Sequence, residues 1–249
     1  MQYCNERGIP TAFWNKEDPV HFGTFLNTAA LFDVVFTTDF DCIHRYRELL
    51  GHARVYLLPF AVQPRQHNPI ETFERKNAAS VAGAYYARYP ERQRDFLRIL
   101  IALLDRGPVE IFDRNHGKTD ADYQFPESYR DYIVGNLPIS EIERAYKGYR
   151  YAININSIKT SQSMFARRVF ELLASNTLTV SNYAKGIRVL LGDLVITGDD
   201  PAELAARLAA LEHDGGRALR RAALRKVLAE HTYQDRVAYV ATKLFEDVT

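Results

Sequence analysis

The residues best suited to chemistry gather in a few stretches of the 249-residue sequence. The densest is the polar run 154–163, which follows an apolar segment and precedes a helical pattern. Its side-chain amides and hydroxyls, together with backbone N–H groups, suit a phosphate, and we assign Asn156, Ser161 and Ser163 to such a ligand. The competing interpretation is that Ser161 or Ser163 caps the following helix, which is the commoner role of serine at such a position.

A carboxylate in an apolar helix is the second feature. Glu171 stands in the string VFELL, inside a helix that the spacing predicts over residues 163–174, so its side chain is expected to be buried. A buried charge needs partners. Ribose hydroxyls would serve, and so would Arg167 or Arg168, each within one helical turn. The spacing alone leaves these two interpretations equal.

A glycine-containing loop supplies the third group. Gly83 ends a predicted strand, and a glycine there permits close approach of a ligand to the backbone. Tyr85 is expected to stack on a base, and Arg88 or Arg92 to pair with a diphosphate. The competing interpretation is that Arg92 and Arg94 are solvated charges on an ordinary helix. The sequence has neither a G-x-G-x-x-G string nor a G-K-[ST] string, so it supports neither a dinucleotide fingerprint nor a P-loop.

Two neighbouring carboxylates near the start of the chain form the last group. Glu17 and Asp18 follow a short strand and are candidates for acid/base chemistry on the acceptor side. A turn with solvated acids explains them equally well. The D-x-D strings at 39–41 and 120–122 are interpreted as loop acids that match by chance, and no clustered cysteines or H-x-x-x-H string indicate zinc. We therefore expect no metal and no other cofactor.

Composition limits the partners. Hydrophobic residues make up 47% and charged residues 25% of the chain, and the formal net charge is +1. This balance is that of a globular protein and gives no general attraction to nucleic acid, although it leaves peripheral membrane contact open. No apolar run approaches the roughly 20 residues of a membrane helix. Two cysteines make no disulfide framework, and a cytoplasmic location is the default expectation.

The elements that must position these groups alternate between strand and helix along most of the chain. This alternation predicts an α/β fold with parallel sheets, including a doubly wound, Rossmann-like second domain. A proline-containing stretch with many charges and little periodicity is the best linker candidate. The expected organisation is a partial N-terminal acceptor-side unit (1–61), a linker (62–76), a nucleotide-binding domain (77–230) and a C-terminal helix packing back toward the first unit (231–249). Because the first unit has only three predicted strands, we expect it to be incomplete.

The stretch RRVFELLASNTLTVSNYAKGIRVLLGDLVITGDDPAEL (167–204) resembles the C-terminal signature of GT-B glycosyltransferases. It is most similar to the glycosyl-transferase group 1 domain of the CgeB-like type, and FDVVFTTD, AGAYYARYPERQ and HTYQDRVAYV extend the resemblance over nearly the whole chain. The resemblance implies a nucleotide-sugar donor, with Glu171 binding the ribose and Gly83 following the first strand of the donor domain. It also assigns Arg167, at the arginine-rich helix start, to the donor. The first acidic position of the family's E-x7-E pattern is Ser163 here, which departs from that pattern.

Three functions fit these observations. The leading hypothesis is a glycosyltransferase that moves a sugar from a nucleotide-sugar donor to a glycan or other acceptor. The alternative is a non-catalytic nucleotide-sugar-binding fragment or partner subunit, favoured by the short first domain. A nucleotide-sugar epimerase shares the architecture but ranks below both, because the local strings resemble those of transferases.

Overall fold

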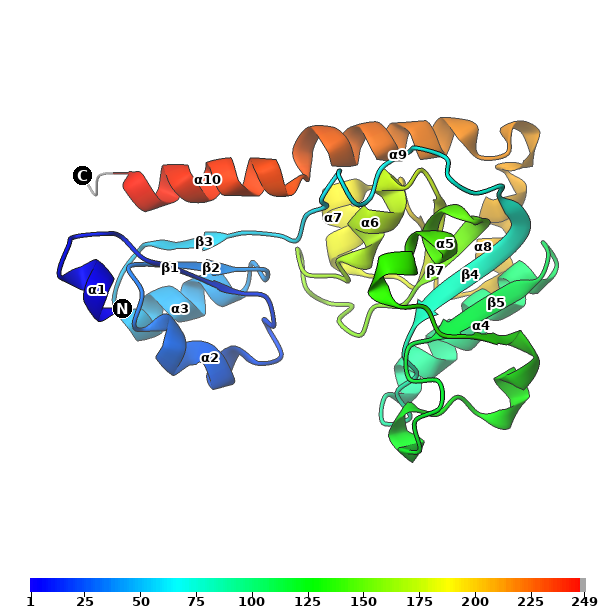
Figure 1. Cartoon of the computed structure of the whole chain (residues 1–249), viewed down its shortest axis with the longest axis horizontal. Helices are drawn as coiled ribbons and strands as arrows, with labels where there is room; N and C mark the ends of the chain where they lie inside the picture. Colours follow the sequence, from blue (N-terminus) through cyan, green and yellow to red (C-terminus); the bar gives the residue numbers. More distant parts are fainter. Residues whose placement is uncertain (247–249) are drawn as a thin grey trace.

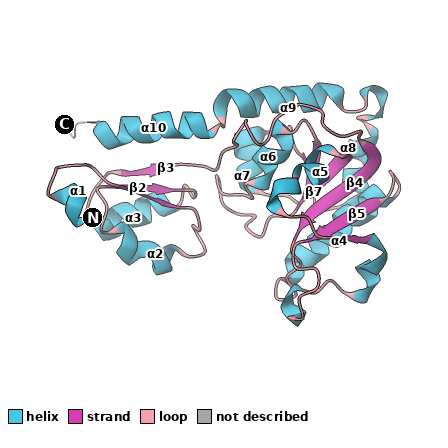
Figure 2. Cartoon of the chain, in the orientation of Figure 1, coloured by secondary structure: helices cyan, strands magenta, loops and turns pink. Residues whose placement is uncertain are grey.

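Two parallel β-sheets organise the chain in the computed structural model, which describes residues 1–246 (Figure 2). The first sheet has three strands in the order β1-β2-β3, and the second has six. Every strand pair in both sheets is parallel. This confirms the predicted α/β class with parallel sheets.

Helices cover both faces of the small first sheet. Cys42 and Tyr46 from α3 join Phe22 and Ala29 from α2 in one apolar cluster with Val35. Helix α3 ends at Gly51, whose φ of 71° is the left-handed conformation that favours glycine beyond a helix end. The elements of this unit are α1 (Gln2–Asn5), β1 (Ala12–Asn15), α2 (Phe22–Ala29), β2 (Val34–Thr37), α3 (Cys42–Leu50) and β3 (Val55–Leu57).

The second sheet has the strand order β6-β5-β4-β7-β8-β9. The chain therefore starts in the middle of the sheet, builds outward to one edge, and then returns to build toward the other. The order in which strands are added reverses between β4 and β7, which lie side by side and are parallel. The strands are β4 (Lys76–Gly83), β5 (Val109–Asp113), β6 (Ile133–Gly135), β7 (Tyr149–Asn154), β8 (Leu178–Ser181) and β9 (Ile196–Thr197).

The helices of this unit pack on both faces of the six-stranded sheet (Figure 1). Helices α4 and α8 share one apolar cluster with the strands, whereas α5, α6, α7 and α9 contribute to two clusters of other residues. The central strands are covered on both sides, as parallel sheets require, whereas Val134 on the edge strand β6 is 49% exposed. The α-helices are α4 (Pro90–Leu104), α5 (Glu143–Lys147), α6 (Arg168–Ala174), α7 (Lys185–Leu191), α8 (Pro201–Ala209), α9 (Arg217–Glu230) and α10 (Tyr233–Phe245), and the 3-10 turns are η1 (Ala121–Tyr123), η2 (Glu127–Tyr132), η3 (Ile139–Glu141) and η4 (Glu212–Asp214).

The last helix, α10, returns to the first unit (Figure 1). Its Val240 and Leu244 pack against the cluster of Val34, Phe36 and Leu58. The Arg54 guanidinium donates hydrogen bonds to the carbonyl oxygens at the end of α10, at 3.0 Å to Leu244. These contacts cover the face of the first sheet that α2 and α3 leave open.

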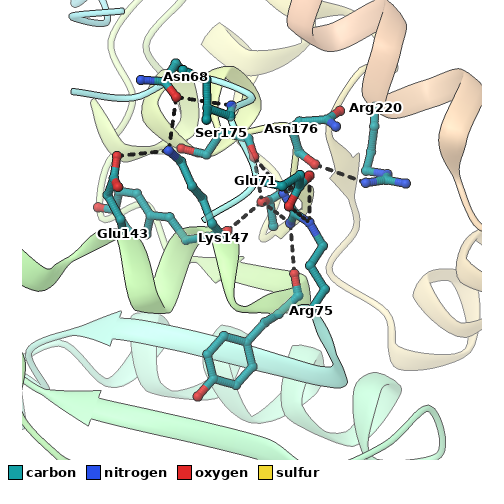
Figure 3. Close-up of polar contacts among 12 residues, drawn as sticks. Asn68, Glu71, Arg75, Glu143, Lys147, Ser175, Asn176 and Arg220 are labelled. Carbon is teal, nitrogen blue, oxygen red and sulfur yellow. Dashed lines mark hydrogen bonds and ion pairs between the residues drawn. The ribbon is translucent and has the colours of Figure 1, made fainter. Parts of the chain in front are cut away.

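The segment between the two sheets is fixed to the second unit by polar contacts (Figure 3). Lys147 is 1% exposed, and its Nζ donates hydrogen bonds to Asn68 at 3.1 Å and Glu143 at 3.0 Å. Arg75 bonds the carbonyl oxygen of Ser175 at 2.9 Å and the carboxylate of Glu71. This segment therefore lies against α5 and the loop before β8.

Element boundaries differ from the predictions where loops replace expected helix. The helix expected from Ser163 begins at Arg168, because Asn156 and Ser161 accept hydrogen bonds from backbone N–H groups at 166 and 164 and hold that stretch as loop. Helices α2 and α7 were not predicted. No helix among residues 1–246 combines the length and the apolar character that crossing a bilayer requires.

Candidate functional site

The point between β4 and β7, where the strand order of the second sheet reverses, is the natural place for a ligand. In open parallel sheets, ligands bind beyond the carboxyl ends of the strands where the chain order switches. Here these ends are Gly83 on β4 and Asn154 on β7. The loops that follow them turn toward opposite faces of the sheet, so the crevice between the loops opens at this point.

A pocket occupies this crevice. Its lining includes two arginines, Arg92 and Arg168, and the other lining residues are Val81, Gly83, Ala84, Tyr85, Gln93, Phe96, Ile111, Phe125 and Ile155. The guanidinium of Arg168 lies beside Gly83, where a Cβ atom would be in ordinary contact with it at 3.5 Å. Arg168 is therefore placed next to the backbone at the end of β4.

Two arginines in this pocket have no anionic partner. Arg92 donates one hydrogen bond, to the carbonyl oxygen of Ala84 at 3.1 Å, and Arg168 has a buried Nε without any hydrogen-bond partner. Within residues 1–246, neither belongs to an ion pair. Burial, and then the charge of Arg168, lower the pKa of Arg92. Two like charges held together in a half-buried pocket are best stabilised by a bound anion.

Glu171 lies one helical turn beyond Arg168. It is 8% exposed, and its carboxylate accepts hydrogen bonds from Arg167 Nε at 2.7 Å and from the Tyr146 hydroxyl at 3.0 Å. The Nε2 atom of His67, from the segment between the sheets, lies 3.9 Å from the same carboxylate. Burial lowers the pKa of His67, so its imidazole is neutral at pH 7. The carboxylate is thus held in one orientation by residues of three different segments.

The sequence left open which arginine pairs with Glu171. The structure assigns that pairing to Arg167, four residues earlier, and turns Arg168 toward Gly83. Arg168 was considered in the sequence only as a partner of Glu171, so its place in the pocket was missed. Positions three and four residues away both face a helical carboxylate, and only the packing against β4 distinguishes them.

The loop between β7 and α6 faces the first unit. The Ser163 hydroxyl donates a hydrogen bond to the carbonyl oxygen of Thr38 at 2.9 Å and accepts one from the Phe40 N–H at 2.8 Å. Gln162 donates to Asp41 at 2.9 Å. The two units therefore meet at the carboxyl end of β2. Ser163 joins them, a role that neither of its predicted functions included.

Asn156 and Ser161, predicted to bind phosphate, are engaged inside the loop. Asn156 is 3% exposed, and its amide bonds Ser181 at 3.0 Å and Asn182 at 3.2 Å. The Ser161 hydroxyl accepts a hydrogen bond from the N–H of Met164 at 2.9 Å. Their polar groups shape the loop and leave little capacity for a ligand. Ser161 does not cap α6 either, because that helix begins at Arg168.

The predicted aromatic and basic groups of the loop after β4 lie differently from the expectation. Tyr85 is 7% exposed, and its ring packs 4.9 Å from that of Phe125, so it lines the pocket from within and has no free face for stacking on a base. Arg88 is exposed and pairs with Asp122. Its charge is already neutralised, whereas that of Arg92 is not.

The predicted acid/base pair divides between surface and core. Glu17 is exposed, whereas Asp18 is fully buried and accepts hydrogen bonds from Thr37 at 2.6 Å and Asn15 at 2.7 Å. Burial raises the pKa of Asp18 to about 6. Asp18 connects the ends of β1 and β2 and does not reach the surface. Within residues 1–246, no group of three His, Cys, Asp or Glu side chains is arranged as a metal site.

Comparison with known proteins gives the family. The profile of a family described as glycosyl transferase-like matches residues 76–242, which is more than half of the chain and includes the whole pocket. The chain belongs to the glycosyl transferase-like family. This glycosyl transferase-like chain is also 22% identical to the spore protein CgeB of Bacillus subtilis, over 73% of its own length and 59% of that of CgeB.

Solved glycosyltransferases share its fold. TarM matches 90% of the chain with a TM-score of 0.62 and 10% identity, and the chain covers 46% of TarM. Anabaena HepE, solved with UDP and glucose, matches 97% of the chain with a TM-score of 0.63 and 12% identity, and the chain covers 73% of HepE. The GT-B fold predicted for this glycosyl transferase-like chain is confirmed. The chain spans about half the length of the first relatives that it matches.

Proposed function

We propose that this chain binds a nucleotide-sugar donor and takes part in transferring its sugar to a glycan or other acceptor. The observation that carries this proposal is the pair Arg92 and Arg168, which lies without a carboxylate partner at the switch point of the sheet. A diphosphate has the charge that this pair lacks, and guanidinium groups bind phosphate oxygens through two parallel hydrogen bonds. Family membership and the fold shared with glycosyltransferases support the same chemistry.

The neighbouring groups suggest how the donor lies. With the diphosphate between the two arginines, the ribose reaches Glu171, whose carboxylate accepts hydrogen bonds from hydroxyl groups. Arg167 and Tyr146 then act as positioning residues, because their hydrogen bonds hold that carboxylate in place. The sugar extends toward the loop of Ser163, which contacts the first unit.

The arginines also provide a chemical role. When the glycosidic bond to the donor breaks, negative charge develops on the departing diphosphate, and fixed positive groups stabilise that charge. Arg92 and Arg168 would supply this stabilisation without a metal ion. Asp18 is omitted from this proposal as a catalytic group because it is fully buried.

We also propose a cytoplasmic location, which the two free cysteines, Cys4 and Cys42, support.

A non-catalytic nucleotide-sugar-binding protein is the second candidate. The observation behind it is the burial of Asp18, which leaves only Glu17 of the two carboxylates that the sequence offered for acid/base chemistry. The two candidates agree on donor binding and differ only in turnover, so one protein preparation can distinguish them.

The test uses the purified chain with UDP, GDP, dTDP and their glucose conjugates. Thermal shift and calorimetry report binding, and release of free sugar reports turnover. We expect one nucleotide series to bind, and the double variant Arg92→Met, Arg168→Met to lose that binding. Binding with sugar release supports the transferase, and binding without it supports the second candidate. If no nucleotide binds the wild-type chain, the proposed donor site is refuted.

A further inference from the structure

The outward face of α9 carries a row of arginines. Arg217, Arg221 and Arg225 are exposed and follow one another at intervals of four residues, so they lie along one side of the helix. The opposite side packs into the domain through Ala223 and Val227. Ala218, Ala222 and Ala229 are the other exposed residues on the arginine side. Since alanine adds little height, the guanidinium groups protrude from a smooth surface.

The charge of this row is not compensated within residues 1–246. The acidic residue of α9, Glu230, pairs with Lys226 instead. Among residues 1–246, no carboxylate forms an ion pair with Arg217, Arg221 or Arg225. Like charges four residues apart destabilise a helix, so this arrangement does not serve the stability of α9. It also contrasts with a whole chain whose formal net charge is only +1.

Helix α10 continues this surface. It follows α9 along the same side of the molecule, above the first unit (Figure 1). Its Val240 and Leu244 pack inward, whereas Phe245, the residue after Leu244, is 69% exposed. We name the outward surfaces of α9 and α10 together the helical face. It combines uncompensated arginines on one helix with an exposed aromatic side chain on the next.

We propose that the helical face docks on a lipid bilayer that contains anionic headgroups. The arginine row complements a surface of negative charge, and each basic residue near such a membrane adds to the attraction. Phe245 can enter the boundary between headgroups and acyl chains. A double-stranded nucleic acid would use the arginines and have no use for this exposed ring.

The helical face is separate from the pocket of Arg92 and Arg168, so membrane docking and nucleotide binding can be measured independently. The experiment is cosedimentation of the chain with vesicles of phosphatidylcholine containing about one third phosphatidylglycerol, and with vesicles of phosphatidylcholine alone. We expect binding only to the anionic vesicles, weakening as salt is added.

The main variant replaces Arg217, Arg221 and Arg225 with Gln. Its partition onto anionic vesicles should fall on the order of 100-fold, since each basic residue contributes about tenfold or less. The same positions changed to Lys should retain binding, because the attraction depends on charge. A second variant, Phe245→Ser, should bind more weakly while keeping the salt dependence. The control changes Arg65, Arg94 and Arg130 to Gln, which alters net charge equally at exposed sites elsewhere.

Melting curves establish that each variant is folded. The proposal is overturned if the folded Gln variant binds anionic vesicles as well as the wild type, or if the control loses as much binding. It is also overturned if the wild-type chain does not bind the anionic vesicles. Binding of a double-stranded DNA oligonucleotide through the same arginines would then make the helical face a nucleic-acid surface.

Discussion

Replacing Arg168 with Met should change stability and nucleotide affinity in opposite directions. Arg168 has a buried Nε without a hydrogen-bond partner and lies near the second charge of Arg92. An unsatisfied buried polar group costs about 1–3 kcal/mol of stability. Methionine has a similar unbranched length and no polar atom, so it fills the space beside Gly83 without that penalty. The free protein should therefore unfold at a higher temperature.

The expected size of each effect follows from the same atoms. Removing a penalty of about 1 kcal/mol should raise the melting temperature by about 2–4 °C for a chain of this size. Losing a charge-assisted hydrogen bond to the diphosphate costs about 1.5–3 kcal/mol, so the dissociation constant of the nucleotide should rise about 10- to 150-fold. Differential scanning calorimetry measures the first change, and isothermal titration with the best nucleotide measures the second.

The matched control is Arg94→Met, which removes an exposed arginine from the same helix as Arg92. It should leave both measurements nearly unchanged. A lower melting temperature with unchanged affinity for Arg168→Met would show that Arg168 is a packing residue. That result would refute our interpretation of the unpartnered guanidinium as part of an anion site.

Three further predictions concern the groups around this pocket. Glu171→Gln should weaken nucleotide binding by about 10- to 150-fold in calorimetry; unchanged affinity with a large fall in melting temperature would make Glu171 a structural residue. Burial raises the pKa of Asp18 from 3.8 to about 6, so the folded state binds this proton more tightly than the unfolded state does. The stability that the bound proton contributes is complete below pH 3.8 and is lost as the pH rises through 6. In urea titrations, Asp18→Asn should therefore gain roughly 3 kcal/mol relative to the wild type between about pH 4 and about pH 6.5, and a constant difference across that range would contradict the burial argument. Ser163→Ala removes both hydrogen bonds to the first unit, so exchange of the Phe40 amide hydrogen should accelerate several-fold while amides of β7 stay protected; equal Phe40 exchange in both proteins would mean that this contact does not hold the units together.

The segment between the sheets contributes to the site more than a simple linker would. His67 contacts the Glu171 carboxylate, and the next residue, Asn68, is bonded to the buried Lys147. Any rotation of the first unit that pulls on this segment therefore acts on the residues around the proposed ribose position. This follows from the burial of His67, which gives its side chain few alternative partners.

The sequence by itself determined the type of fold. Alternation of β-branched strands with helical patterns requires parallel sheets, because each strand must return to the same end of the sheet through a crossover. It also determined that Glu171 is buried and partnered, since VFELL leaves a carboxylate inside an apolar helix. Gly83 at the end of β4 could also be recognised from the sequence, because a glycine permits close approach to the backbone.

Only the tertiary structure decided which polar groups are free. Asn156, Ser161 and Arg88 have suitable chemistry, but partners from β8, the same loop and a distant 3-10 turn already occupy them. Arg168 looked equivalent to Arg167 in the sequence, and packing against β4 separated them. Composition and spacing give each side chain its capacity for hydrogen bonds and charge. Whether that capacity is used within the protein depends on contacts between residues far apart in the chain, which no local pattern specifies.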